Sequence, residues 1–317
     1  MLESFLVHPT YSVRSSGLSL LVSSSATTKP ISGETFDLLR MHLAAYYADH
    51  DAKFRNETLA MTKDLVNRVK YVIAMANRSL AKLEAKSQSK AVGEQPTKPT
   101  EKKKRYTENL ITDAKEAQTV LERHTSFLNW YIEFLKGELI PTSSYQRHIA
   151  ALKAFLPVLK LGKHASASDE ALDMDMARSI FTDVTCLRLL LDLLMDPFDD
   201  VRETAMDILL MVPQDIVSES LSCQYDNDGK ARTLLDTLRL FCARATKLAS
   251  RTGRADHGNG AARAQGLLCD WVKNTDAQIS LVSGSLETLE AKLAKARGDL
   301  GHAAVNNSVH GDFAALG

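Results

Sequence analysis

The side chains with the clearest chemical potential lie in one stretch near the C-terminal end of the sequence, "SRTGRADHGNGAAR", residues 250–263. Glycines just before a predicted helix start are flanked there by four basic side chains, Arg251, Arg254, His257 and Arg263. Free backbone amides at a helix N-terminus, together with positive side chains, can hold a phosphate group. The simpler interpretation, which we favour, is a solvated loop between helices whose glycines allow a tight turn.

The same stretch does not match a nucleotide-binding loop. Gly258-Asn259-Gly260 begins a G-x-G pattern, but Arg263 occupies the position of the third glycine and no strand pattern precedes it. The phosphate-binding pattern G-x-x-x-x-G-K-[S/T] is absent from the sequence, and the histidines lack the paired helical spacing with acids that a metal site needs. We therefore expect no cofactor, no metal and no catalytic residue, and a regulator or scaffold rather than an enzyme.

A second basic cluster lies in the middle of the chain: Lys102, Lys103, Lys104 and Arg105. Such a cluster could contact RNA phosphates or serve as a nuclear localisation signal. Glu94 and Glu101 lie close by in the sequence, and no aromatic side chains for base stacking are interleaved with the cluster. These neighbours favour a solvated linker over a nucleic-acid site.

The overall composition favours no charged partner. Lys and Arg total 39 and so do Asp and Glu, so the net charge is zero and binding to nucleic acid or to a membrane would need a local patch. The cysteines are too widely spaced for a zinc knuckle or a disulfide framework, which favours reduced thiols in the cytoplasm or nucleus. A cytoplasmic location is also expected because neither a signal-peptide pattern nor a bilayer-spanning apolar run is present.

Apolar side chains recur at helical spacing through nearly the whole sequence. Ser32 is a predicted helix N-cap, and the stripe that follows it consists of Phe36, Leu39, Leu43 and Tyr47. A longer stripe follows Asp51, another predicted N-cap, and continues from Phe54 to Ile73. Alternation of period two with β-branched residues is hard to find. The sequence therefore predicts an all-α protein.

Two stretches interrupt the helical pattern. Residues 86–105 are dominated by Pro, Gly, Ser, Lys and Glu, and cannot bury enough apolar surface to offset the entropy of ordering, so we expect a disordered basic linker or insertion there. A flexible loop is expected at about 162–173. The sequence thus divides into helical repeats over 1–85 and 106–300 and a tail over 301–317 that leads towards a missing downstream domain.

One short pattern occurs more than once. Residues 9–21, "PTYSVRSSGLSLL", align without a gap with residues 197–209, "PFDDVRETAMDIL". Both have Pro, then Val-Arg four residues later, a small residue three positions after the arginine, and a Leu or Met after that. Looser copies give a set of four corresponding arginines: Arg14, Arg55, Arg147 and Arg202. The first two intervals between them correspond to roughly one and two repeats of the HEAT/armadillo class.

Such a unit predicts a hairpin of two helices joined by a short turn. A single hairpin cannot bury both of its faces, so hairpins stack into a HEAT/armadillo-like α-solenoid of antiparallel helix pairs. We expect the four arginines to form a structural ladder by bonding carbonyls or a carboxylate of the next repeat. In the last copy, Asp196, Asp199 and Asp200 supply such acids. Contact of these arginines with a ligand is the alternative.

Several long segments resemble the THADA family, the thyroid adenoma-associated proteins and their fungal counterparts. The segments are residues 8–43, 51–69, 127–155 and 190–210. The closing residues 306–317, "NNSVHGDFAALG", are similar to the junction that precedes the central domain of that family. The resemblance covers most of the chain and is weakest in 86–105 and in 163–173.

The resemblance implies a helical-repeat scaffold that partners the catalytic subunit of a tRNA 2′-O-methyltransferase acting at position 32 of the anticodon loop. tRNA is a further implied partner, and no membrane is. No catalytic residue is carried over, because the scaffold of that family holds no methyl-transfer site. The Arg-Arg-Ser-Ala-Gly-Leu motif of the family's central domain is missing, so we expect a fragment of the N-terminal repeat region. The alternative is a helical-repeat protein–protein adaptor without RNA contact.

Overall fold

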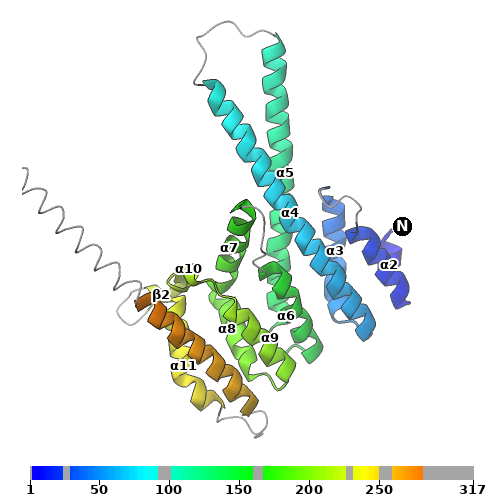
Figure 1. The fold of residues 1–317 in the computed structure, drawn as a ribbon. Coiled ribbons are helices and arrows are strands. Elements are labelled where there is room, and N and C mark those ends of the chain that lie inside the picture. The colour runs from blue at the N-terminus through cyan, green and yellow to red at the C-terminus, as the bar shows by residue number, and fades with distance from the viewer. Residues whose placement is uncertain are drawn as a thin grey trace, which may run out of the picture.

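The computed structural model describes residues 2–23, 29–91, 101–159, 167–225, 231–249 and 259–280. Within these ranges, antiparallel helices pack side by side in successive pairs (Figure 1). The helices are α1 (Leu2–Leu6), α2 (Tyr11–Val22), α3 (Gly33–Tyr47), α4 (Ala52–Ala91), α5 (Glu101–Glu138), α6 (Tyr145–Leu159), α7 (Ala167–Phe181), α8 (Val184–Asp192), the 3-10 turn η1 (Leu193–Met195), α9 (Asp199–Leu210), α10 (Gln214–Val217) and α11 (Leu234–Ala249). A further helix covers residues 259–280. The prediction of an all-α stack of helix hairpins is confirmed.

The helix starts follow the capping residues of the sequence. The Ser32 hydroxyl accepts the backbone N–H of Thr35 at 3.2 Å at the start of α3. At the start of α4, Oδ1 of Asp51 accepts the N–H of Lys53 at 2.8 Å and that of Phe54 at 3.2 Å. Both side chains satisfy amides that have no partner inside the helix, which stabilises each helix start. The two predicted N-caps are confirmed.

Aromatic side chains form the core between α3, α4 and α5. Phe36 stacks on Phe127 with ring centroids 4.2 Å apart. The hydroxyls of Tyr47 and Tyr131 lie 2.6 Å apart, and that of Tyr47 lies 3.2 Å from the hydroxyl of Thr62. A buried hydroxyl that cannot bond to water needs a hydrogen-bond partner within the protein, and these contacts supply it. The predicted stripe of α3 is confirmed, because its four members are all buried: Phe36, Leu39, Leu43 and Tyr47.

The buried tyrosines should make stability fall at alkaline pH. Burial raises the pKa of Tyr131 to about 12, so the folded chain keeps a proton that the unfolded chain loses near pH 10. The free energy of unfolding should therefore decrease between pH 10 and 12, with Tyr131 contributing up to about 1.4 kcal/mol per pH unit. Urea unfolding at several pH values should show a shallower decrease for Tyr131→Phe. The exposed Tyr71 is the control, and Tyr71→Phe should leave the slope unchanged.

The long hairpin of α4 and α5 corrects the prediction for residues 86–105 at both ends. Residues 86–91 belong to α4 and residues 101–105 to α5, whereas 92–100 lie outside the described residues. A shortage of apolar surface does not by itself prevent helix formation. Lys, Glu, Gln and Ala have high helix propensity, and extending a helix that is already nucleated costs little. Figure 1 shows both helices extending well beyond the rest of the stack.

The prediction of a flexible loop at 162–173 also needs correction. Residues 167–173 are the first half of α7, and residues 160–166 lie outside the described part of the chain. Asp173 is buried and forms an ion pair with Lys70 of α4, whose ammonium also donates to the carbonyl of Val158 at 3.1 Å. This contact with a distant helix stabilises a helical segment whose own composition favours a loop, and packing of α7 against α6 and α8 adds to it.

A short hairpin lies within the region predicted to be helical repeats. Strand β1 (Ser220–Tyr225) pairs antiparallel with β2 (Ala231–Thr233), with Ser220 opposite Thr233. Within β1, Leu221 is buried. Strands this short contain too few residues for an alternation of period two to be recognised. The pattern of apolar residues therefore does not predict this hairpin. The expected tail, residues 301–317, lies outside the described residues.

Candidate functional site

The turn between α3 and α4 is held by one aspartate and one arginine. Asp49 uses Oδ1 to accept the backbone N–H of Asp51 at 2.9 Å, which shapes the turn. Its carbonyl accepts Nη1 of Arg55 at 2.5 Å. The arginine therefore reaches back six residues from the first turn of its own helix. The side-chain carboxylate and the main-chain carbonyl of Asp49 thus both accept hydrogen bonds that close the turn.

The same arrangement holds the turn before α9. Oδ1 of Asp196 accepts the N–H of Phe198 at 2.9 Å, and its carbonyl accepts Nη1 of Arg202 at 2.5 Å. Arg202 also forms an ion pair with Asp199, and its side chain is only 4% exposed. Spacing and bond pattern are those of the α3–α4 turn. A structural repeat therefore underlies the sequence pattern.

A third copy, before α2, replaces the aspartate by a histidine. The N–H of Thr10 donates to Nδ1 of His8 at 3.1 Å, and Nη1 of Arg14 donates to the carbonyl of His8 at 2.8 Å. Nη2 of the same arginine reaches the next hairpin, where it forms an ion pair with Oδ2 of Asp49 at 2.6 Å. The guanidinium also lies 4.7 Å from the ring centroid of Phe54, a cation–π distance.

The contact between neighbouring hairpins is made by the second carboxylate oxygen of each aspartate. Asp49 receives Arg14 there, and Asp196 receives Nδ1 of His148 at 3.0 Å. Nε2 of His148 lies 3.0 Å from the carbonyl oxygen of Ile140, so both ring nitrogens contact oxygen atoms. Two layers of the stack are thus connected through buried side chains.

The four arginines of the expected ladder therefore have different contacts. Arg14 reaches the next hairpin, whereas Arg55 and Arg202 bond within their own turns. Arg147 pairs with Glu138 of the preceding helix at 3.1 Å. The position that connects α6 to the following hairpin is the next residue, His148, which the alignment of repeats does not select. A one-residue difference in register between copies explains that miss.

The loop with the predicted phosphate site is only partly within the described residues. Arg251, Arg254 and His257 lie outside them. Arg263 is exposed on helix 259–280 and lines a groove of about 490 Å³ together with α9. The acidic side chains of that groove are Asp199, Asp200, Glu203 and Asp207. They make the surroundings of Arg263 unfavourable for a phosphate group.

Gly260 has a packing role in place of the expected turning role. A Cβ added there would lie 2.9 Å from Cζ of Arg202 and closer still to its Nη2. Because glycine has no Cβ, helix 259–280 can lie close to the guanidinium of Arg202, which closes the turn before α9. The second glycine of the Gly258-Asn259-Gly260 pattern thus serves the contact between two helices.

The second basic cluster lies at the start of α5. Residues 102–105 are helical, and the structure does not describe their side chains. Among the residues that it does describe, no helix has the length and apolar content to cross a membrane. The same part of the chain holds no group of three His, Cys, Asp or Glu side chains that could bind a metal ion.

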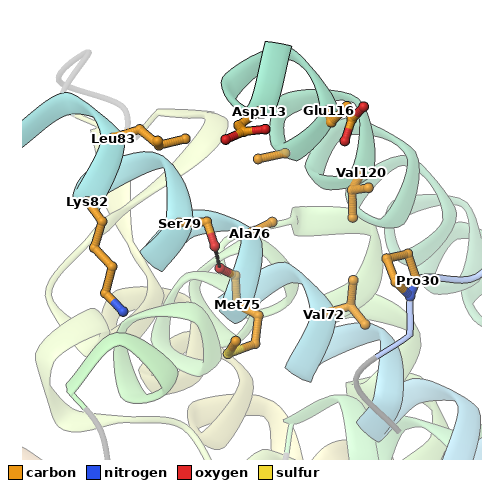
Figure 2. Close-up of a pocket in the computed structure, with 11 residues that line it drawn as sticks. Pro30, Val72, Met75, Ala76, Ser79, Lys82, Leu83, Asp113, Glu116 and Val120 are labelled. Carbon is orange, nitrogen blue, oxygen red and sulfur yellow. Dashed lines mark hydrogen bonds between the residues drawn. The ribbon is translucent and has the colours of Figure 1, made fainter. Parts of the chain in front are cut away.

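A groove of about 490 Å³ lies between α4 and α5, beyond the aromatic core (Figure 2). Val72 and Ala76 of α4 form a buried apolar floor. Asp113 and Glu116 of α5 stand at its edge and are exposed. Sequence reasoning selected no residue of this groove, because each one by itself is an ordinary helical residue.

The fold and these surfaces define a helical-repeat protein with buried inter-hairpin contacts and open grooves. A family model described as "Trm732, TPR repeats" matches residues 1–203. The chain therefore belongs to this family, which connects it with tRNA modification. The match agrees with the resemblance to the N-terminal repeat region of the THADA family. TPR repeats, like the HEAT/armadillo class predicted from the sequence, are stacked pairs of antiparallel helices.

Proposed function

We propose that this chain is a non-catalytic scaffold that holds a tRNA 2′-O-methyltransferase and assists ribose methylation at position 32 of the anticodon loop. The observation that carries this proposal is the match of the Trm732 family over residues 1–203, a region that folds as a stack of helix hairpins. Stacked hairpins present extended surfaces suited to a protein partner. The chain contributes position and rigidity, and the methyl-transfer chemistry belongs to the partner.

The rigidity that a scaffold needs has a structural basis in the turns. The ion pair of Arg14 with Asp49 and the side-chain contact of His148 with Asp196 fix successive hairpins relative to each other, and these side chains are largely buried. The pair of Lys70 and Asp173 adds a third such link, between α4 and α7. Buried charges keep their geometry because leaving one unpaired is costly. A partner bound across several hairpins would then meet a surface of fixed shape.

The direct test is reconstitution with the purified methyltransferase. The chain should co-elute with the enzyme in size-exclusion chromatography and should increase ribose methylation at position 32 of the tRNA. Binding of tRNA should be measured with and without the enzyme. If neither the enzyme nor tRNA binds, the proposal is wrong. Binding of another protein without RNA contact would favour the adaptor function, with which the acidic groove of α9 agrees.

Contact with tRNA would involve the basic cluster at the start of α5. Replacing residues 102–105 by alanine removes four positive charges there. If they bind phosphates, tRNA affinity should fall, and the slope of log affinity against log salt concentration should decrease by about 0.7 to 0.9 for each phosphate that is no longer neutralised. Fluorescence anisotropy with labelled tRNA at several salt concentrations measures both. An unchanged slope would exclude this cluster from RNA binding.

A further inference from the structure

The groove between α4 and α5 lies where small side chains of the two helices face each other. Near the core, α5 carries larger side chains: Phe127 stacks on Phe36 of α3, and the hydroxyl of Tyr131 contacts that of Tyr47. Further along the hairpin, the facing positions are Ala76, Ser79 and Ala117. These side chains are too short to close the gap between two helices, so a groove remains that a side chain from elsewhere can occupy.

The floor of the groove is apolar, and polar side chains stand on both helices: Ser79 and Lys82 on α4, Asp113 and Glu116 on α5. The hydroxyl of Ser79 donates to the carbonyl of Met75 in its own helix at 2.9 Å, so it does not reach into the space (Figure 2). Met75 is 38% exposed, and Leu83 is half-buried at the far end. From Val72 to Leu83 the floor extends for about 16 Å, which is about three turns of a bound helix.

The charges at the edge of the groove select the kind of partner. Asp113 and Glu116 stand on α5, while Lys82 on α4 points away from Asp113 (Figure 2). Phosphate groups would be repelled by these carboxylates, whereas Lys or Arg side chains would be attracted. The apolar floor and the acidic edge together match an amphipathic helix whose apolar stripe is flanked by basic residues.

We propose that this groove is a docking site for such a basic amphipathic helix of a protein partner. Apolar side chains spaced three or four residues apart enter the space above Ala76 and Ser79, and basic side chains contact Asp113 and Glu116. This inference goes beyond the scaffold function, because it assigns one surface and one partner chemistry. Its test needs neither tRNA nor a methyltransferase, so failure of one proposal is distinguishable from failure of the other.

The test uses two fluorescein-labelled helical peptides of about 18 residues, long enough to cover three turns with flanks. Both carry leucines at positions i, i+3, i+4 and i+7, and one has flanking lysines where the other has glutamates. Fluorescence anisotropy with the full chain should give at least about tenfold tighter binding of the lysine peptide. Equal affinity of the two peptides would overturn the proposal.

Three variants locate the binding site. Glu116→Lys should weaken binding of the lysine peptide by about fivefold or more, because it replaces attraction by repulsion. Glu122→Lys is the matched control: it makes the same charge change on α5 at an exposed glutamate outside the groove, and affinity should stay unchanged. Ser79→Phe fills the gap and should weaken binding about tenfold. Circular dichroism verifies that each variant is folded, and an equal loss for both glutamate variants would place the site elsewhere.

Discussion

Asp196→Ala should lower the free energy of unfolding by about 3 kcal/mol, the largest loss expected from any single turn residue. The substitution removes the carboxylate that faces buried His148 and the acceptor for the N–H of Phe198. The carbonyl of residue 196 stays in place, so the bond from Arg202 is not removed. The loss therefore combines the link between hairpins with the side-chain bond that shapes the turn, and it leaves the arginine bond in place. Urea unfolding followed by circular dichroism gives the value.

Two further variants separate this link from a general effect of charge. Asp207→Ala removes an exposed carboxylate from α9, the helix that follows the turn of Asp196, and should change stability by no more than about 0.5 kcal/mol. Asp196→Asn should lose clearly less than Asp196→Ala, because the amide oxygen can still accept from Phe198 and the amide group can still contact Nδ1 of His148. Equal losses for the alanine and asparagine variants would mean that the hydrogen bonds of residue 196 contribute little without the negative charge of the carboxylate.

Gly260→Ala should destabilise the chain by about 2 kcal/mol, although alanine favours helices. The new methyl group would lie against the guanidinium of Arg202, which is buried and held by the carbonyl of Asp196. Either helix 259–280 or the arginine must move. Gly266 is the matched control, because nothing lies within 4 Å of a Cβ added there. Gly266→Ala should raise stability by about 0.5 to 1 kcal/mol.

A double-mutant cycle tests whether the collision with Arg202 causes the loss. In Arg202→Ala the obstructing side chain is gone, so adding Gly260→Ala should cost much less than it does in the unmodified chain. Additive losses would show that the alanine disturbs the backbone of helix 259–280 instead. Thermal unfolding of the four proteins, with hydrogen exchange of helix 259–280, distinguishes the two results.

Local rules predicted much of the fold because each helix start and stripe depends on residues that are close in sequence. Ser32 and Asp51 cap their helices by contacts over two or three residues, and the stripe from Phe36 to Tyr47 follows the helical period. The limits of α4 and α7 were less predictable. Lys70 of α4 pairs with Asp173 in the first half of α7 although the two segments are far apart in the chain, and local composition does not predict that contact.

The candidate sites depended on contacts that a linear comparison cannot supply. Aligning repeats selected Arg147, but His148 makes the link, because the two copies differ by one residue in register. Gly260 fits a turn in the sequence pattern, and only its distance from Arg202 reveals the packing role. The α4–α5 groove depends on small residues of two helices facing each other, and the sequence shows neither the pairing nor the empty space.

The arginine that closes each of the three matching turns binds a main-chain oxygen, and this has a consequence for how such repeats diverge. Every residue type offers that oxygen, so the side chain six positions before the arginine can change from aspartate to histidine without loss of the bond, as it does between Asp49 and His8. The residue type at that position can therefore change between repeats while the turn keeps its structure. A search for further copies of the repeat should require the arginine and allow any residue six positions before it.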